Sequence, residues 1–378
     1  VLYLLLIPAI TILTYWRMKS IILPIHSTSS TSTAKTSTVS FEHKNNEFSV
    51  QRAYDSLIHL SHEQDGFGEH AFTSQKCHNV HQWLLQYLHS TVAELGNRLK
   101  DSKMIEVLID EQNESSEFKI EDSPVTGQQL RRYANVTNVL AMIRPRVSDQ
   151  KGENGENDHQ KLFMNDAILL NSHFDSRVSS TGAFDDGVPV VVMMELFSNL
   201  LHELLSHEKL QISSAAATTK AKIAHLLRRP IIFLWNGAEE MGLLGAHAFM
   251  NRHPWAQQVK SFINLEAAGF GGGAFLFQTT NAWITKEYAK TMVHPMGNAI
   301  GQDLFQTGIV PSDTDYRFFT LMKKQQQMHG VDSAFVENGH WYHTSLDSLT
   351  TNGYSHDDIK KSIVHMGDNS ASLLRHLA

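Results

Sequence analysis

Short apolar segments typical of buried strands alternate with helix-like segments along most of this chain. Six segments have the composition of strands: residues 104–109, 138–143, 167–172, 230–235, 261–265 and 274–278. Five others have the spacing of helices: residues 52–62, 78–95, 190–205, 243–251 and 283–294. Strands that are apolar on both sides need cover on both faces, and intervening helices allow neighbouring strands to run parallel. We therefore predict an α/β fold in which helices flank both faces of a mixed, mainly parallel central sheet.

The composition is that of a folded protein with a large core. Of the 378 residues, 42% are hydrophobic and 19% are charged, which suffices for one large domain or two smaller ones. The net charge of −7 comes without a basic stripe, so we expect no nucleic-acid partner. Cys77 is the single cysteine, which excludes an intrachain disulfide and a cysteine-rich metal site.

The N-terminal part of the sequence divides into an apolar segment and a polar one. Residues 1–16 carry no charge and are shorter than the roughly 20 residues that span a bilayer. We interpret them as part of a transmembrane anchor, with a signal peptide as the alternative. Residues 17–47 contain a Ser/Thr-rich stretch and predict a flexible linker. A folded domain is then expected over residues 48–378.

Two sequence signals disagree about the side of the membrane on which this domain lies. Arg17 and Lys19 follow the apolar segment, and the positive-inside rule would put the domain in the cytosol. Glycosylation sequons at Asn113 and Asn135 have meaning only in a lumen or outside the cell. The flanking charges and the sequons leave both orientations open.

Acidic and imidazole side chains gather where the predicted strands end. In open α/β sheets, catalytic groups collect at the carboxyl ends of the strands. His173 and Asp175 follow one strand and, being two residues apart, project to the same side of an extended chain. A metal-bound imidazole needs its second nitrogen held, and a nearby carboxylate does this. Asp185 and Asp186 form a turn before the next helix, where helix capping is the alternative role.

The most informative pair is Glu239 and Glu240, which follow the predicted strand at residues 230–235 after the short segment Asn236-Gly237-Ala238. Burying a carboxylate without a partner is costly, so a metal ion would compensate one of the two. The other could then take a proton from water as a general base.

Two later segments also place a candidate metal ligand near the end of a predicted strand. Glu266 ends the predicted strand at residues 261–265, and His343 comes after strand-like residues 334–337. Two histidines and several carboxylates at successive strand ends indicate a metal centre at this edge of the sheet.

The order of these motifs resembles the M28 family of dinuclear zinc aminopeptidases, and within it the endoplasmic reticulum metallopeptidase branch. The motifs are HFDS at 173–176, NGAEE at 236–240, NLEAAG at 264–269, PSDTDYR at 311–317 and YHT at 342–344. The resemblance covers the chain from about residue 48 to its end and implies a zinc aminopeptidase-like α/β/α sandwich. It therefore assigns residues 48–378 to an M28-like peptidase domain.

The resemblance also implies a set of metal ligands. Two zinc ions per chain would share the carboxylate of Asp185. His173 and Glu266 would complete the ligands of one ion, and Glu240 and His343 those of the other. Glu266 departs from the wider family, in which Asp is commoner, although Glu is normal in the metallopeptidase branch.

Three further residues receive catalytic roles from the resemblance. Glu239 would be the general base, Asp175 would orient His173, and Tyr342 would stabilise the tetrahedral intermediate. We interpret Asp186 as a helix-capping neighbour.

The function implied is that of a membrane-anchored, aminopeptidase-type exopeptidase whose lumenal domain hydrolyses peptides in the endoplasmic reticulum or a related endomembrane. A glutaminyl cyclase-like acyltransferase with a single zinc ion is one alternative, because the segment from Asp185 to Leu196 is similar to that group as well. A catalytically inactive binding or receptor module is another, although the complete ligand set argues against it. Two polar segments, a hairpin-like excursion at residues 148–161 and an insertion at 212–224, add no recognisable chemistry.

Overall fold

The computed structural model describes residues 48–121, 128–146, 165–213, 227–297, 299–307, 313–321, 328–351 and 353–378. The predicted anchor and linker lie outside these residues. So do the predicted excursion at 148–161 and all but the first two residues of the insertion at 212–224.

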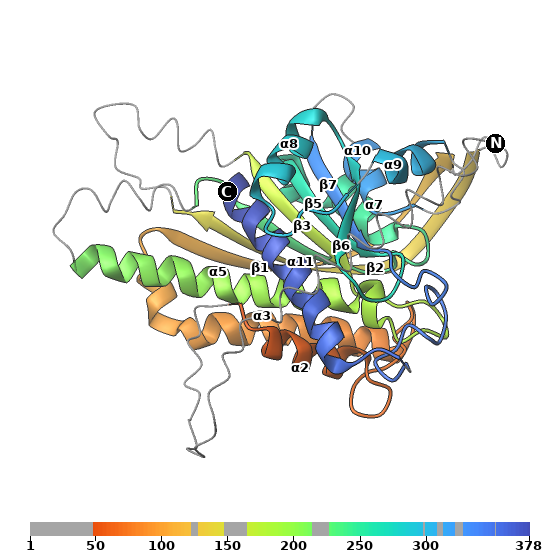
Figure 1. Ribbon diagram of the computed structural model, residues 1–378. Helices are drawn as coiled ribbons and strands as arrows, with labels where there is room; N and C mark the ends of the chain where they lie inside the picture. The colour runs from red at the N-terminus through yellow and green to blue at the C-terminus, as the bar shows by residue number, and fades with distance from the viewer. Residues whose placement is uncertain are drawn as a thin grey trace, which may run out of the picture. The chain divides into compact units, whose positions relative to one another are not determined.

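A seven-stranded sheet runs through the described part of the chain, in the order β1-β2-β4-β3-β5-β7-β6 (Figure 1). Its strands are β1 (Ile105–Glu121), β2 (Gln128–Pro145), β3 (Ala167–His173), β4 (Ile231–Asn236), β5 (Val259–Ala267), β6 (Ala274–Thr279) and β7 (His329–Phe335). Strands β4, β3, β5 and β7 pair in parallel, whereas β1, β2 and β6 join antiparallel at the two sides. The predicted mixed sheet with a parallel centre is confirmed.

Helices cover both faces of this sheet (Figure 1). The helices are α2 (Val50–Ser61), α3 (Gln75–Lys100), α5 (Val188–Ser213), α7 (Leu244–Arg252), α8 (Ala282–Thr291), α9 (Ala299–Gln306), α10 (Tyr316–Leu321) and α11 (His356–Leu377). Two short helical turns, η2 (Ala183–Gly187) and η3 (Pro254–Gln258), precede α5 and β5.

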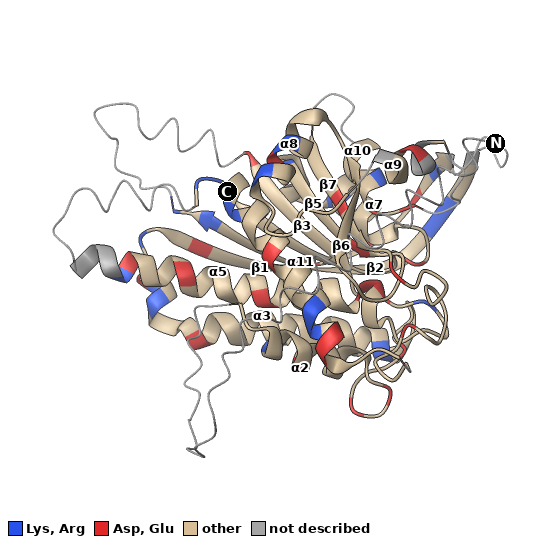
Figure 2. Cartoon of the chain, in the orientation of Figure 1, with Lys and Arg blue, Asp and Glu red and all other residues tan. Residues whose placement is uncertain are grey.

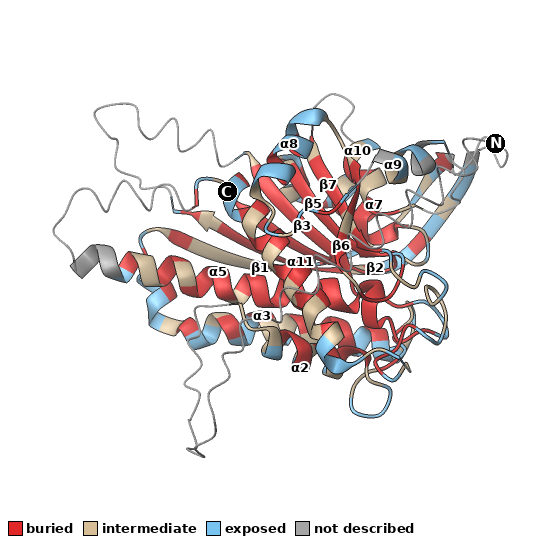
Figure 3. Cartoon of the chain, in the orientation of Figure 1, coloured by how far each residue is buried: buried red, intermediate tan, exposed pale blue. Residues whose placement is uncertain are grey.

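The alternation of side chains along the strands builds two apolar layers, because successive residues point to opposite faces. Leu170 of β3 packs in a layer with α2, α3, α5 and α11, and its neighbour Leu169 packs with α7 and α10. Figure 3 shows the strands as a buried band between the helices. The charged side chains lie mostly on the helices and the β1–β2 hairpin, and few lie on the central strands (Figure 2). The sheet is therefore covered on both sides, as the sequence predicts.

Helix α5 is the one helix among the described residues that has the length and apolar composition of a membrane span. The stretch Ala183–Lys209 is long and apolar enough to cross a membrane, but 89% of its most apolar window is buried inside the protein. Contacts with the sheet and with α2 and α11 account for this burial, so α5 is a core helix of this fold.

The structure departs from the sequence prediction in several elements. Strands β1 and β2 extend well beyond the predicted segments, because their outer halves pair with each other as a polar hairpin. Strand β7 begins at His329, five residues before the predicted strand-like segment, since Gly330 and Asp332 interrupt its apolar pattern. Helix α11 is absent from the prediction, although the spacing of Ile359, Ile363 and Met366 is helical.

The two-layer packing predicts that neighbouring residues of β3 are equally sensitive to truncation. Leu169→Ala and Leu170→Ala should each lower the free energy of unfolding by about 2–5 kcal/mol, because each leaves a cavity in a closed layer. Urea unfolding of the purified variants measures this. Leu130→Ala, at a position that is 50% exposed on β2, is the control and should be nearly neutral. A neutral result for either β3 variant would show that one face of the sheet is open.

Candidate metal centre

The sheet topology brings the predicted site residues to one edge. His173 is the last residue of β3, and Glu266 lies one residue before the end of β5. Glu239 and Glu240 follow β4 after a two-residue turn. Because β4, β3 and β5 are adjacent and parallel, their carboxyl ends meet at the same edge.

Asp185 lies between the two histidines. Its Oδ1 is 3.1 Å from His173 Nε2, and its Oδ2 is 3.3 Å from His343 Nε2. The same His343 nitrogen is 3.0 Å from Glu240 Oε2. The two oxygens of one carboxylate therefore each face a different imidazole, which is the arrangement that a carboxylate bridging two cations requires.

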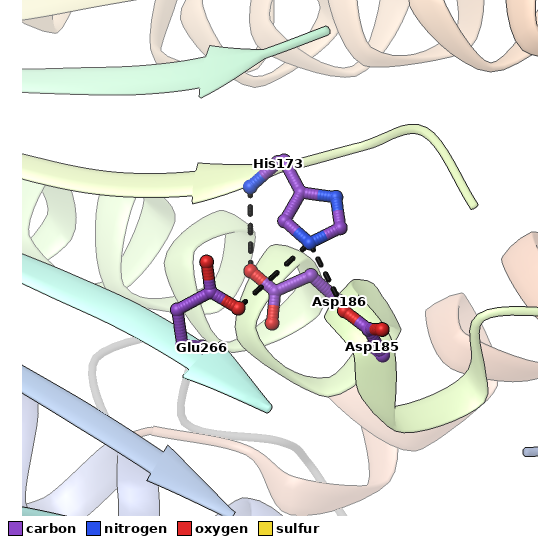
Figure 4. Close-up of side chains that lie close together, drawn as sticks. All are labelled: His173, Asp185, Asp186 and Glu266. Carbon is purple, nitrogen blue, oxygen red and sulfur yellow. Dashed lines mark hydrogen bonds and ion pairs between the residues drawn. The ribbon is translucent and has the colours of Figure 1, made fainter. Parts of the chain in front are cut away.

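Two groups of side chains in the described residues could each hold a metal ion, and Asp185 belongs to both. One group adds Glu240 and His343, and the other adds His173, Glu266 and Asp186. Figure 4 shows the second group, in which Glu266 Oε2 is 3.9 Å from His173 Nε2. The structure thus brings together all five predicted ligands.

Asp186 has a different environment from the one expected of a helix-capping residue. Its Oδ2 accepts a hydrogen bond from the backbone N–H of His173 at 3.3 Å, so the carboxylate lies against the end of β3. The side chain is buried, and its Oδ1 has no hydrogen-bond partner among the described residues. Asp186 therefore supports the position of His173 and belongs to the candidate ligand group.

The predicted base and its neighbours are also at this edge. Glu239 Oε2 is 3.9 Å from His173 Nε2. Asp175 Oδ1 is 3.7 Å from His173 Nδ1, and the carbonyl oxygen of Asp175 is 2.9 Å from the same nitrogen. The Asp175 carboxylate also accepts the backbone N–H groups of Glu239 at 3.0 Å and Glu240 at 3.3 Å. Asp175 therefore contacts the imidazole and fixes the turn that carries both glutamates.

Tyr342 stacks on the imidazole of His343, with 3.6 Å between the ring centroids. Burial raises the pKa of its phenol, and the carboxylates of Asp185 and Glu239 add to this effect. Tyr342 is thus a neutral hydroxyl donor close to the carboxylates.

The electrostatics of the site favour a bound cation. Burial raises the pKa of Glu239, Glu266 and Asp186 well above the usual range, and neighbouring carboxylates raise these pKa values further. Burial likewise raises the pKa of Glu240 to about 7. For Asp185, burial acts in the same direction, but hydrogen bonds from the two histidines lower its pKa to about 2.

Unsatisfied atoms point to the same conclusion. Glu240 Oε1 and Asp186 Oδ1 are buried and accept no hydrogen bond from any described residue. Buried carboxylate oxygens are costly in this state, whereas divalent metal ions are bound by such oxygens together with imidazole nitrogens. The residues present therefore fit a metal ion.

A row of buried polar side chains, which the sequence analysis missed, lies two or three residues before the site on the central strands. Asn236 donates to Asn171 at 3.0 Å, Asn171 to Asn264 at 2.7 Å, and Asn264 to Asp332 at 2.9 Å. The carboxylate of Asp315 accepts from Asn171 at 3.0 Å and from Asn236 at 2.6 Å. The sequence contains one signal of this row, which is the single asparagine within each of the apolar strands β3, β4 and β5.

The model of "Peptidase family M28" matches residues 154–366 of the chain. The chain belongs to peptidase family M28. Endoplasmic reticulum metallopeptidase 1 of Homo sapiens is 35% identical to this M28 chain, over 74% of the chain and 26% of the relative. The Mus musculus protein of the same name is 33% identical over 88% of the chain and 31% of its own length. The predicted family is confirmed, and the family and these relatives support the predicted peptidase class.

Another relative of this M28 chain is a vacuolar membrane protease of Arthroderma otae, 31% identical over 79% of the chain and 27% of that protein. The chain spans about a quarter to a third of the length of the curated relatives that it matches.

Solved structures show the same fold. The LapA aminopeptidase of Legionella pneumophila has a TM-score of 0.51 at 14% identity, covering 93% of this M28 chain and 80% of LapA. A glutaminyl cyclase from an Acidobacteriales bacterium has a TM-score of 0.50 at 13% identity, covering 92% and 99% of the two chains. The predicted fold class is confirmed, and at these identities the likeness concerns the fold alone.

The contacts of two buried carboxylates predict opposite results for the metal-free chain. Asp175→Asn should cost about 1–3 kcal/mol, because an amide has one acceptor where two backbone N–H groups need one each. Asp186→Asn should change little, because the amide oxygen retains the acceptor for the His173 N–H, and Asp186 Oδ1 has no hydrogen bond among the described residues to lose. Urea unfolding in the presence of a chelator measures both. A larger loss for Asp186→Asn than for Asp175→Asn would contradict these assignments.

Proposed function

We propose that this chain is the peptidase domain of a dinuclear zinc exopeptidase of the aminopeptidase type. The observation that carries this proposal is the position of Asp185, whose two carboxylate oxygens face His173 and His343 separately. His173 and Glu266 would complete one set of ligands, and Glu240 and His343 the other. A set of imidazole and carboxylate ligands suits zinc.

The chemistry of the proposed reaction is divided between the cations and the chain. Two zinc ions held there would polarise the carbonyl of the scissile peptide bond and lower the pKa of the attacking water. Glu239 would take the proton from that water and pass it to the leaving amine, and its raised pKa suits both steps. Tyr342 would donate its hydroxyl hydrogen to the carbonyl oxygen as negative charge develops there.

The supporting residues have roles that follow from their contacts. Asp175 would hold the imidazole of His173 and, through the two N–H groups that it accepts, keep Glu239 and Glu240 at the cations. The turn between β4 and α7 would then present one glutamate as base and the next as ligand. Residues that hold the metal ligands in place in this way usually change metal affinity or activity by about one or two orders of magnitude when they are substituted.

We further propose that the domain faces the lumen of the endoplasmic reticulum or a related endomembrane, attached through residues 1–16. The names of the relatives, endoplasmic reticulum metallopeptidase and vacuolar membrane protease, support this compartment. Both sequon residues, Asn113 and Asn135, are exposed on the β1–β2 hairpin.

The dinuclear proposal predicts the behaviour of a base-deleted variant. The unaltered chain should bind two zinc ions and hydrolyse a peptide with a free amino terminus faster than its N-acetylated form. Glu239→Gln should keep the zinc and lose about 10²- to 10⁴-fold in kcat, because the proton acceptor is removed. Metal analysis of the purified chain and a peptide hydrolysis assay measure these, with Glu94→Gln, at an exposed position of α3, as the control.

Other outcomes of this experiment would support the alternatives. One zinc ion per chain, with cyclisation of amino-terminal glutamine, would indicate a glutaminyl cyclase-like enzyme. A chain without metal and without activity would indicate a binding module. His173→Ala should lower the zinc content, and an unchanged content would remove His173 from the ligand set.

The lumenal proposal predicts two glycan acceptors. In a secretory-pathway expression host, treatment with an N-glycosidase should increase the gel mobility of the full chain. Asn113→Gln and Asn135→Gln should each remove part of the shift, and the double variant should remove all of it. Asn97→Gln, at an exposed position outside any sequon, should leave the shift unchanged. A chain that carries no glycan would count against the lumenal orientation.

A further inference from the structure

The turn that carries Asp185 is only partly held by its own backbone hydrogen bonds. Gly182, which precedes η2, is in the left-handed region at φ 59°. Asp185, with φ −103° and ψ 86°, and Asp186, with φ −121° and ψ 34°, depart from helical angles inside η2. The N–H groups of this turn therefore need acceptors from elsewhere in the protein.

Asp347 supplies these acceptors. Its Oδ1 accepts the backbone N–H of Phe184 at 2.8 Å, and its Oδ2 accepts the N–H of Asp185 at 3.3 Å. Its Oδ2 also accepts the hydroxyl of Ser180 at 3.3 Å. The carbonyl oxygen of Asp347 accepts two further hydrogen bonds, from Thr181 Oγ1 at 2.8 Å and from the Ala183 N–H at 3.4 Å. A single residue that is 1% exposed thus contacts the turn from residue 180 to residue 185.

The same residue is linked to the other side of the candidate centre. Asp347 donates its N–H to the carbonyl of Thr344 at 3.1 Å, and Thr344 donates to the carbonyl of Trp341 at 3.1 Å. These consecutive turns carry His343, whose Nε2 is 3.3 Å from Asp185 Oδ2. Asp347 therefore connects the loop of the bridging carboxylate to the loop of the late histidine.

We propose that Asp347 is a positioning residue that sets the distance between Asp185 and His343 and so determines how tightly the second cation is bound. This inference rests on the proposed dinuclear function. A carboxylate suits the task better than an amide, because both of its oxygens accept and neither donates. Its loss would move the bridging carboxylate relative to one histidine, while His173, Glu266 and Asp186 would keep their own contacts.

The test is a zinc titration of the purified full chain against a competing chelator. Asp347→Asn should weaken the second ion about 10- to 100-fold and the first ion much less, because the first group keeps three side chains besides Asp185 and the second keeps only two. A role in stability alone would weaken both ions equally or neither. Glu208→Gln is the matched control, because Glu208 is a buried carboxylate that also accepts a backbone N–H, that of Lys103 at 2.8 Å. It lies near the opposite end of α5, and its substitution should change neither affinity.

A milder variant keeps the test decisive if Asp347→Asn does not fold. Thr181→Val removes the hydroxyl that donates to the Asp347 carbonyl and preserves the shape of the side chain. It should weaken the second ion by roughly two- to tenfold. Unchanged affinity for the second ion in the folded variants would overturn the inference. An unaltered chain that binds fewer than two ions would instead overturn the dinuclear function itself.

Discussion

The burial of many carboxylates at one edge of the sheet is the constraint on which the rest of this structure depends. Each buried carboxylate needs hydrogen-bond donors or a cation, and the loops at this edge are shaped to provide them. Asp175 accepts two backbone N–H groups of the β4 loop, and Asp347 accepts two from the turn before α5. Backbone N–H groups thus stabilise the carboxylates of Asp175 and Asp347. The loops that these hydrogen bonds hold orient Asp185 and Glu240 toward the histidines.

Much of the fold follows from apolar patterning. The strands that are buried on both faces, such as β3 and β4, have largely apolar sequences, so their ends were predicted within one residue. The β1–β2 hairpin was underestimated, because its outer half is mostly polar and the buried side chains on one face, among them Ile120, Tyr133 and Val136, are widely spaced. The start of strand β7 was missed because Gly330 and Asp332 interrupt its apolar sequence. Gly330 leaves room for the ring of Phe262, and Asp332 accepts a hydrogen bond from Asn264.

The candidate site was predictable to the extent that its residues stand at strand ends in a recognisable order. The roles of Asp315 and Asp347 were not predictable, because each depends on a partner that is distant along the chain. Asp347 and Phe184 are 163 residues apart, and Asp315 and Asn171 are 144 apart. A sequence shows that a carboxylate is present, but it does not show which backbone N–H group that carboxylate will face.

The row of amide side chains across the central strands has a consequence for how the chain assembles. A slip of one residue in any of these strands would turn its amide, or in β7 the carboxyl group of Asp332, to the opposite face, into an apolar layer without a partner. The bonds from Asn236 through Asn171 and Asn264 to Asp332 therefore admit a single alignment of β4, β3, β5 and β7. Since β7 is the last of these strands along the chain, the alignment is complete only when nearly all of the domain has been synthesised, and cation capture must follow sheet closure.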